Sequence, residues 1–144
     1  MEGEVTALSY SGDIVVVGSY KKHNYSGEVA IFSWDRHFWK QVGQSFVGAS
    51  EYDYLGSSVA ISMDGSRVAF GAPNEDSGNG IVRVQEWNNV SWIQLGENLK
   101  GSGYFGYTVA LNDIGSQLAV GSITANFDRG EVRVFSYSGT SWIG

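Results

Sequence analysis

The sequence predicts an all-β fold made of β-propeller blades, three four-stranded antiparallel meanders that follow one another along the chain. The first observation is composition: 20 of the 144 residues are glycine, one is proline, and only 17% are charged. Such a composition is typical of short strands joined by glycine turns. The second is a set of glycines and tryptophans that recur at one spacing, and the third is a run of short apolar segments within each repeat.

The repeat is defined by landmarks that all step by 53 and then by 50 residues. The turn glycines Gly12, Gly65 and Gly115 share these steps, as do Gly18, Gly71 and Gly121, then Gly27, Gly80 and Gly130, and finally Trp39, Trp92 and Trp142. A period of this length indicates a solenoid or a propeller. We therefore predict blade 1 over residues 1–54, blade 2 over 55–104 and blade 3 over 105–144, together one partial propeller domain. The fourth strand of blade 3 is incomplete.

The second unit shows why each segment should be a strand. Residues Gly56–Ser62 are apolar and β-branched, and Asp64-Gly65 is a hairpin signal that returns the chain through Arg67–Ala72. Residues Ile81–Trp87 alternate apolar and polar side chains, as a half-buried strand does. After the Asn88-Asn89 turn, Trp92–Leu95 is the fourth strand. The three extra residues of the first unit fall between Gly43 and Gly56.

The alternative all-β architecture is a sandwich, which has no reason to repeat its turns and tryptophans at one period. Small residues after each second strand, Gly18, Gly71 and Gly121, suit blades that crowd together at one end. Two sets of aromatic residues occupy repeated positions, so we expect them to pack between the sheets. They are Trp34, Trp87 and Tyr137, and Trp39, Trp92 and Trp142.

The blade heads Leu55-Gly56 and Phe105-Gly106, with Gly71-Ala72-Pro73 after a second strand, resemble FG-GAP repeats of integrin α-type β-propellers. The resemblance implies an extracellular or cell-surface protein that binds protein or glycan, as in cell adhesion. It also implies calcium in the loop between the first two strands. Here that loop, residues 62–66 and its copies, offers one or two side-chain oxygens, whereas calcium takes six to eight.

The sequence does not predict an enzyme. Only His23 and His37 could act as bases near neutral pH; both fall in turns at non-equivalent places, and no nucleophile-elbow pattern is present. Loop acids are not repeated between units, as a converging set of carboxylates would require. Asn74, Asp76 and Asn79 form one oxygen-rich loop, the weak candidate for calcium, but its spacing lacks the alternation of a calcium loop. We expect no cofactor.

The loop between the second and third strands is the predicted contact surface. Its three versions keep the same length between framing glycines while their chemistry changes from basic to acidic to mixed. Loops on a rigid scaffold commonly carry binding function, although neutral drift would give the same pattern. The candidate ligand-binding residues are Tyr20, Lys21, His23, Tyr25, Asn74, Glu75, Asp76, Asn126, Phe127 and Asp128. Tyr52 and Tyr107 are further loop aromatics that the repeat does not require.

Net charge and hydropathy exclude two classes of partner. A net charge of −6 lacks the basic footprint of a nucleic-acid binder, and no apolar run is long enough to span a membrane. Asn24 and Asn89 begin N-glycosylation triplets in turns, which agrees with an extracellular protein.

The predicted function is a non-catalytic binding or scaffold module for protein or glycan. One alternative is a structural repeat of a surface filament, and another is the propeller domain of a carbohydrate-active enzyme. Propellers close with about four to eight blades, so three blades need partners. We expect either further blades of a longer chain or a second copy of this one.

Overall fold

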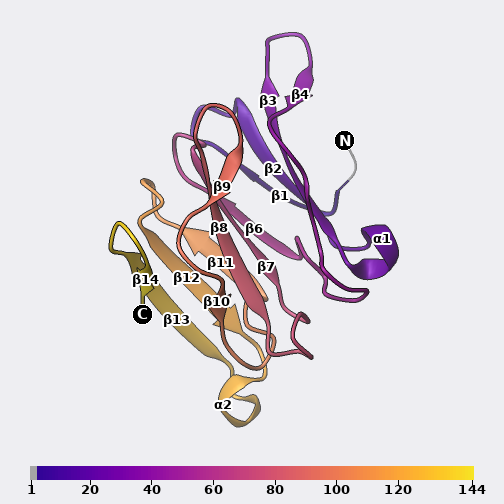
Figure 1. The fold of residues 1–144 in the computed structure, drawn as a ribbon, viewed down its shortest axis with the longest axis vertical. Coiled ribbons are helices and arrows are strands. Elements are labelled where there is room, and N and C mark those ends of the chain that lie inside the picture. The colour runs from indigo at the N-terminus through magenta and orange to yellow at the C-terminus, as the bar shows by residue number, and fades with distance from the viewer. Residues whose placement is uncertain (1–2) are drawn as a thin grey trace.

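The computed structural model describes residues 3–144 and contains three antiparallel sheets that follow one another along the chain (Figure 1). The first sheet consists of β1 (Val5–Leu8), β2 (Ile14–Ser19), β3 (Glu28–Trp34), β4 (Trp39–Gln41) and β5 (Phe46–Val47). The second consists of β6 (Ser58–Ile61), β7 (Arg67–Ala72), β8 (Ile81–Trp87), β9 (Trp92–Gln94) and β10 (Leu99–Lys100). The third consists of β11 (Thr108–Leu111), β12 (Gln117–Ser122), β13 (Glu131–Tyr137) and β14 (Trp142–Ile143).

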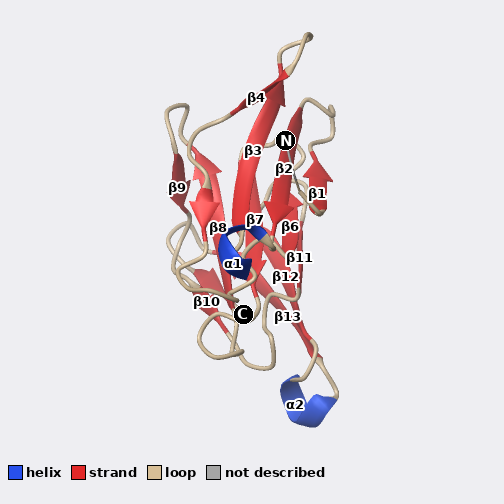
Figure 2. Ribbon diagram, turned by 90° about the vertical axis from the view of Figure 1, so that its right-hand side faces the viewer, coloured by secondary structure: helices blue, strands red, loops and turns tan. Residues whose placement is uncertain are grey.

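Strands and loops make up almost all of the described chain, which confirms the all-β prediction (Figure 2). Two single-turn helices, α1 (Lys22–Tyr25) and α2 (Ala125–Asp128), stand in loops that join a second strand to a third. The first four strands of each sheet pair in chain order, so the paths run β1-β2-β3-β4, β6-β7-β8-β9 and β11-β12-β13-β14. The predicted strands Arg67–Ala72 and Ile81–Trp87 match β7 and β8 in both boundaries.

The fourth strand differs from the prediction, because it is broken into two pieces in the first two sheets. Both β4 and β5 pair with β3, and both β9 and β10 pair with β8. The break falls at Gly43 and Gly96, whose φ angles of 70° and 78° turn the chain out of the sheet. The predicted fourth strand at Trp92–Leu95 corresponds to β9, which ends one residue earlier, whereas the second piece, β10, was not predicted. Two-residue pieces such as Leu99–Lys100 are too short to show any periodicity.

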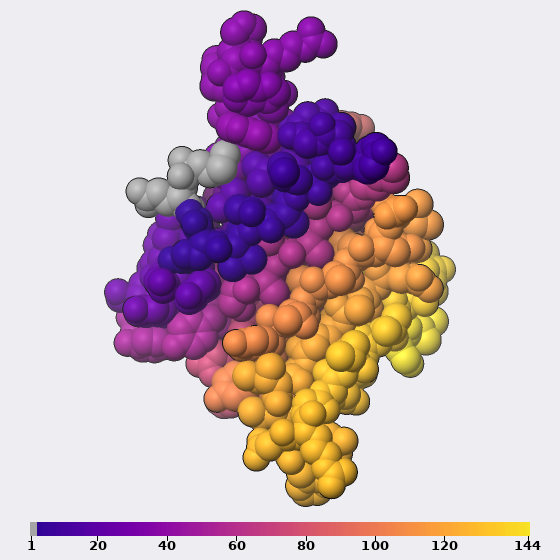
Figure 3. Space-filling view, turned by 180° about the vertical axis from the view of Figure 1, so that it is seen from behind, coloured from indigo at the N-terminus to yellow at the C-terminus, as the bar shows by residue number. Residues whose placement is uncertain are grey.

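The three sheets lie closest to one another at their first strands, where β1 contacts β6 and β6 contacts β11. Figure 3 shows the corresponding diagonal bands, ordered from the indigo N-terminal unit to the yellow C-terminal one. A Cβ atom placed on Gly18 would lie 2.0 Å from the Gly56 carbonyl oxygen, and one on Gly71 would lie 2.0 Å from that of Gly106. Only glycine permits this approach, as the small residues after each second strand predicted.

The core consists of two apolar layers, one in each space between neighbouring sheets. Val16, Val29 and Ile31 of the first sheet pack with Val68 and Phe70 of the second. The next layer combines residues of the second and third sheets. It contains Ala69, Val82, Val84, Leu118, Val120 and Phe135. The second sheet is therefore buried on both faces.

The repeated tryptophans pack between sheets in two of the three units. Trp92 and Trp142 are 3% and 5% exposed, and their indole Nε1 groups donate to the carbonyls of Val42 and Leu95, each in the preceding unit. Trp34 and Trp39 pack on each other, as the equivalent pairs of the other units also do, but they are 42% and 36% exposed. The expectation that this first pair is core was wrong, because no described residues precede the first sheet there to cover it.

Candidate functional site

The three loops between second and third strands share an unusual backbone conformation. Residues 23–25, 76–78 and 126–128 all have φ between 53° and 84°. These residues stand at equivalent positions, since they are again 53 and 50 apart. A run of left-handed residues costs about 1–2 kcal/mol for each non-glycine residue, so the fold must impose it.

Equivalent hydrogen bonds hold this left-handed turn in all three units. The N–H of Gly27 donates to the Lys22 carbonyl, and that of Ser26 donates to the His23 carbonyl. Gly80 and Gly130 donate in the same way to the carbonyls of Glu75 and Ala125. Because backbone groups alone define the turn, its length is fixed while its side chains are free to differ. The constant loop length in the sequence has this physical cause.

The side chains of the first loop form a charged cluster on one flank. The His23 ring nitrogen Nε2 lies 2.8 Å from Glu28 Oε2, and Lys22 Nζ lies 3.3 Å from Oε1 of the same carboxylate. Burial raises the pKa of Glu28, but the hydrogen bonds from His23 and Lys22 outweigh it and lower the pKa overall. Lys21 lies beside the Tyr20 ring and 3.6 Å from Glu4. His23 is thus hydrogen-bonded to Glu28 rather than placed as a base facing a cleft.

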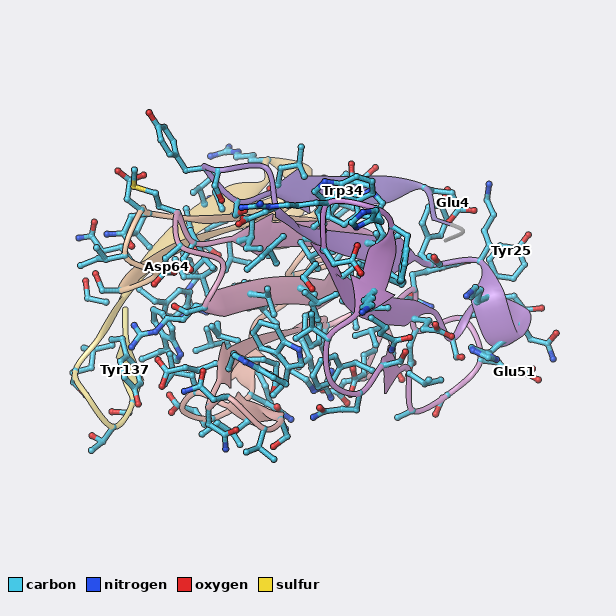
Figure 4. All side chains as sticks on the ribbon, turned by 90° about the horizontal axis from the view of Figure 1, so that it is seen from above. Glu4, Tyr25, Trp34, Glu51, Asp64 and Tyr137 are labelled. Carbon is cyan, nitrogen blue, oxygen red and sulfur yellow. The ribbon has the colours of Figure 1, made fainter. Side chains whose placement is uncertain are left out.

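Four tyrosines gather next to this cluster. The rings of Tyr25 and Tyr52 are stacked with centroids 5.7 Å apart, and Tyr54 meets Tyr25 and Tyr20 edge-on at 5.9 and 6.3 Å. Tyr52 belongs to the segment between β5 and β6, which holds the three extra residues of the first unit. Asn24 also reaches this segment, donating to Glu51 at 3.1 Å. Figure 4 shows Tyr25 and Glu51 together at one side of the molecule, opposite Asp64 and Tyr137.

The second loop is tied to the protein by its own side chains. The Asn74 amide donates to the Tyr52 carbonyl at 2.7 Å, and Glu75 forms a bidentate ion pair with Arg83. Asp76 accepts a hydrogen bond from the Asn79 amide at 3.3 Å. Within residues 3–144, no three His, Cys, Asp or Glu side chains lie close enough to hold a metal ion. In these contacts the side-chain NH2 groups of Asn74 and Asn79 donate and the Asp76 carboxylate accepts.

Asp53 is a buried carboxylate near this loop. It is 6% exposed, and its Oδ2 accepts the Ser50 N–H at 2.7 Å. Burial raises the pKa of Asp53, the Ser50 N–H opposes that effect, and the nearby Glu75 charge raises the pKa further. Its hydrogen bond closes a turn of the extra segment, so its role is structural.

The third loop stands apart from the other two. Phe127 is 95% exposed, and Asn126 and Asp128 beside it are exposed as well. The predicted contact surface is therefore split: the first two loops meet at the tyrosines, whereas the third lies at the lower end of Figure 1 as α2.

A cleft of about 370 Å³ lies where the first two loops meet the heads of the second and third units. Its lining residues are Tyr20, Tyr54, Ser57, Pro73 and Tyr107. Tyr20 and Tyr107 were singled out from the sequence, and Pro73 belongs to the predicted contact loop without having been named as a ligand residue, but Tyr54 and Ser57 were not identified. Tyr54 and Ser57 flank the head Leu55-Gly56, so their proximity to the head glycine is the signal that could have identified them.

The cleft combines aromatic rings with one unpaired hydroxyl. The Ser57 Oγ atom is buried and has no hydrogen-bond partner among residues 3–144. Leaving a buried hydroxyl unpaired costs about 1–3 kcal/mol. None of the five lining residues is an acid, a histidine or a lysine. The cleft thus offers flat apolar faces and hydroxyl groups but no acid–base pair.

The two glycosylation asparagines are on the surface, Asn24 in α1 and Asn89 in the turn between β8 and β9. Both have positive φ angles. No helix within residues 3–144 has the length and apolar character needed to cross a membrane.

The fold, but not the sequence, is similar to that of known proteins. No family model matches the chain, and no curated protein does, so the FG-GAP resemblance stays a prediction. Among solved structures, a putative 6-phosphogluconolactonase from Bacteroides fragilis NCTC 9343 matches with a TM-score of 0.66 at 12% identity over 96% of this chain and 36% of its own. A functionally unknown protein from Desulfotomaculum acetoxidans DSM 771 gives 0.65 at 14% identity, over 96% of this chain and 38% of its own.

Hydrazine synthase from Kuenenia stuttgartiensis gives a TM-score of 0.64 at 11% identity, over 96% of this chain and 34% of its own. The chain thus spans about a third of the length of each of these structures. At such low identity the likeness concerns the fold alone, which is all-β and propeller-like.

Proposed function

We propose that the three sheets are consecutive blades of a β-propeller and that the chain is a non-catalytic binding module. The convergence of the sheets at β1, β6 and β11 supports the radial arrangement. The cleft at the loop end supports the binding role, because aromatic-lined hollows with a few polar groups are the usual form of ligand sites.

The ligand that suits this cleft is a neutral glycan. A sugar ring presents an apolar face that can lie on a tyrosine ring, and its hydroxyls can pair with the tyrosine hydroxyls. The lining carries no charged side chain that would favour an anionic or cationic ligand. Exposed Asn24 and Asn89 triplets are consistent with a protein exposed outside the cell.

The single observation that carries the proposal is the composition of the lining: three tyrosines, one proline and an unpaired serine, with no carboxyl, histidine or lysine side chain. Hydrolysis of a glycoside requires two carboxyl groups within about 5–10 Å of each other at the substrate. The B. fragilis structure, named for a lactonase, raises the hydrolase alternative, but this cleft contains no group to support it.

The test is binding of neutral oligosaccharides by the chain and by Tyr107→Ala, with Tyr10→Ala as the matched control. Tyr107 lines the cleft and is 50% exposed, whereas Tyr10 is 82% exposed in the distant β1–β2 turn. One stacked ring contributes about 0.5–1.5 kcal/mol, so Tyr107→Ala should weaken binding by roughly two- to tenfold, with Tyr10→Ala unchanged. Equal affinity of both variants, or binding of peptides and no glycan, would contradict the proposal.

A further inference from the structure

The two outermost sheet faces of the described chain are the two halves of one repeated interface. We call the outer side of the third sheet the tail face; it carries Ala110, Ala119, Gly121, Val132 and Val134. We call the outer side of the first sheet the head face; it carries Thr6, Leu8 and Phe32, together with Val15 and Val17, which are only 6% and 3% exposed. In the repeat, tail-face positions of one unit pack against head-face positions of the next.

The tail face exposes side chains that the first two units bury. Val132 and Val134 are 72% and 58% exposed. Their equivalents in the second unit, Val82 and Val84, are 0% and 1% exposed beneath the third sheet. An apolar strand face with this exposure is characteristic of an interaction surface.

The tail face also contains the groove into which a blade head fits. In the first two units a Cβ on Gly27 or Gly80 would lie 2.1 Å from the carbonyl oxygen of Leu55 or Phe105, the head residue of the next unit. The equivalent Gly130 meets no neighbouring unit and borders an open groove of about 490 Å³, together with Gly121, Val132 and Arg129.

Backbone groups at the hairpin tips repeat the same head-to-tail order. The Tyr10 N–H donates to the Met63 carbonyl at 3.0 Å, and the Met63 N–H donates to the Asp113 carbonyl at 2.7 Å. Among residues 3–144 this ladder leaves the Asp113 N–H at the tail end and the Tyr10 carbonyl at the head end without backbone partners. The two remaining groups are a donor and an acceptor, so one end of the ladder complements the other.

The head face retains the residues that meet a preceding blade in the other units. Trp39 stands where Trp92 and Trp142 donate to the preceding unit, and Gly3 stands where Gly56 and Gly106 abut it. Leu8 on this face is 59% exposed.

We propose that a second copy of this chain docks head to tail, so that the head face of each copy covers the tail face of the other. This inference rests on the proposed blade arrangement. Two copies then supply six sheets, within the range of about four to eight that closes a propeller. A contact between two tail faces is disfavoured, because Gly121 and the Asp113 N–H would meet their own copies rather than complementary groups.

The first experiment measures the mass of the full chain in solution by light scattering over a range of concentrations. We expect twice the monomer mass of 15.6 kDa. Val134→Lys, which places a charge on the tail face, and Leu8→Lys, which places one on the head face, should each give monomers. Val90→Lys is the matched control, since Val90 is 80% exposed in the β8–β9 turn away from both faces, and its mass should stay doubled. Circular dichroism checks that every variant remains folded.

The second experiment mixes the two monomeric variants. Val134→Lys keeps an intact head face and Leu8→Lys keeps an intact tail face, so a mixture should form heterodimers that neither variant forms alone. A wild-type chain that remains monomeric at high concentration, or a Leu8→Lys variant that still dimerises, would overturn the proposal. Tyr20→Ala should weaken glycan binding without altering the mass, because Tyr20 lines the cleft but not the tail-face groove. Failure of the assembly and failure of the binding site are thereby distinguished.

Discussion

Replacing Gly71 by alanine tests the close approach between the second and third sheets. The added Cβ would lie 2.0 Å from the Gly106 carbonyl oxygen and 2.6 Å from Ser58 Oγ. Since the first of these is a backbone atom, the sheets must separate locally. Ser58 Oγ also donates to the same Gly106 carbonyl at 2.7 Å, so that buried hydrogen bond would be strained or lost.

The expected loss of stability follows from these two contacts. Overpacking a well-packed interior costs about 1–3 kcal/mol, and a typical hydrogen bond contributes about 0.5–1.5 kcal/mol. Alanine also lowers the conformational entropy of the unfolded chain relative to glycine, which stabilises the folded state by about 0.4–1 kcal/mol and offsets part of this loss. We therefore expect Gly71→Ala to lower the free energy of unfolding by about 2–3 kcal/mol, a large share of the stability of a domain this size.

Gly121→Ala is the matched control, because it is the same substitution at the equivalent place in the third unit. There the close neighbour is the Thr108 side-chain oxygen, which can rotate away, and no backbone atom of another sheet lies nearby. Both substitutions should be made in the Val134→Lys background, so that assembly does not contribute, and compared by urea unfolding. Equal destabilisation by the two variants would refute the reasoning, since the effect would then not come from the neighbouring sheet.

Two further predictions concern the inter-sheet tryptophans and the charged cluster. Trp92→Phe removes a buried indole that donates to the Val42 carbonyl at 2.8 Å, so it should lower the free energy of unfolding, measured in urea, by about 1–3 kcal/mol. Trp39→Phe, at a 36% exposed residue, should lower it by less than about 1 kcal/mol. Similar losses for the two variants would show that the inter-sheet hydrogen bond is unimportant. The lowered pKa of Glu28 gives stability that is present above its ordinary value of 4.5 and lost as the pH falls through the folded-state value. Glu28→Gln should therefore be less stable than wild type at neutral pH and approach it in acid, and a difference that does not change with pH would contradict this.

Local chemistry explains how much of the fold could be predicted from the sequence. Gly12 and Gly65 turn their hairpins with φ angles of 77° and 76°, and β8 shows its alternation directly. These features depend on residues that are close in the sequence. Because the pattern occurs in three units, it can be recognised even where one unit departs from it. The sequence likewise indicated that loops such as residues 20–25 carry aromatic residues that the repeat does not require.

The candidate site needed the tertiary structure because its residues come from separate units. Tyr20, Pro73 and Tyr107 belong to three different units and meet only because the sheets converge. Tyr52 joins Tyr25 because the three extra residues of the first unit fold back over its loop. Phe127, which looked equivalent in the sequence, is isolated because the third unit has no following sheet among residues 3–144.

By itself the sequence determined the period, the turns, most strands and the all-β class, since each is encoded within a few residues of chain. Only the tertiary structure decided which faces are covered and which are bare, because burial depends on whether a neighbouring sheet is present. Val84 and Val134 make the point: they occupy equivalent positions in equivalent strands, yet one is 1% exposed and the other 58%.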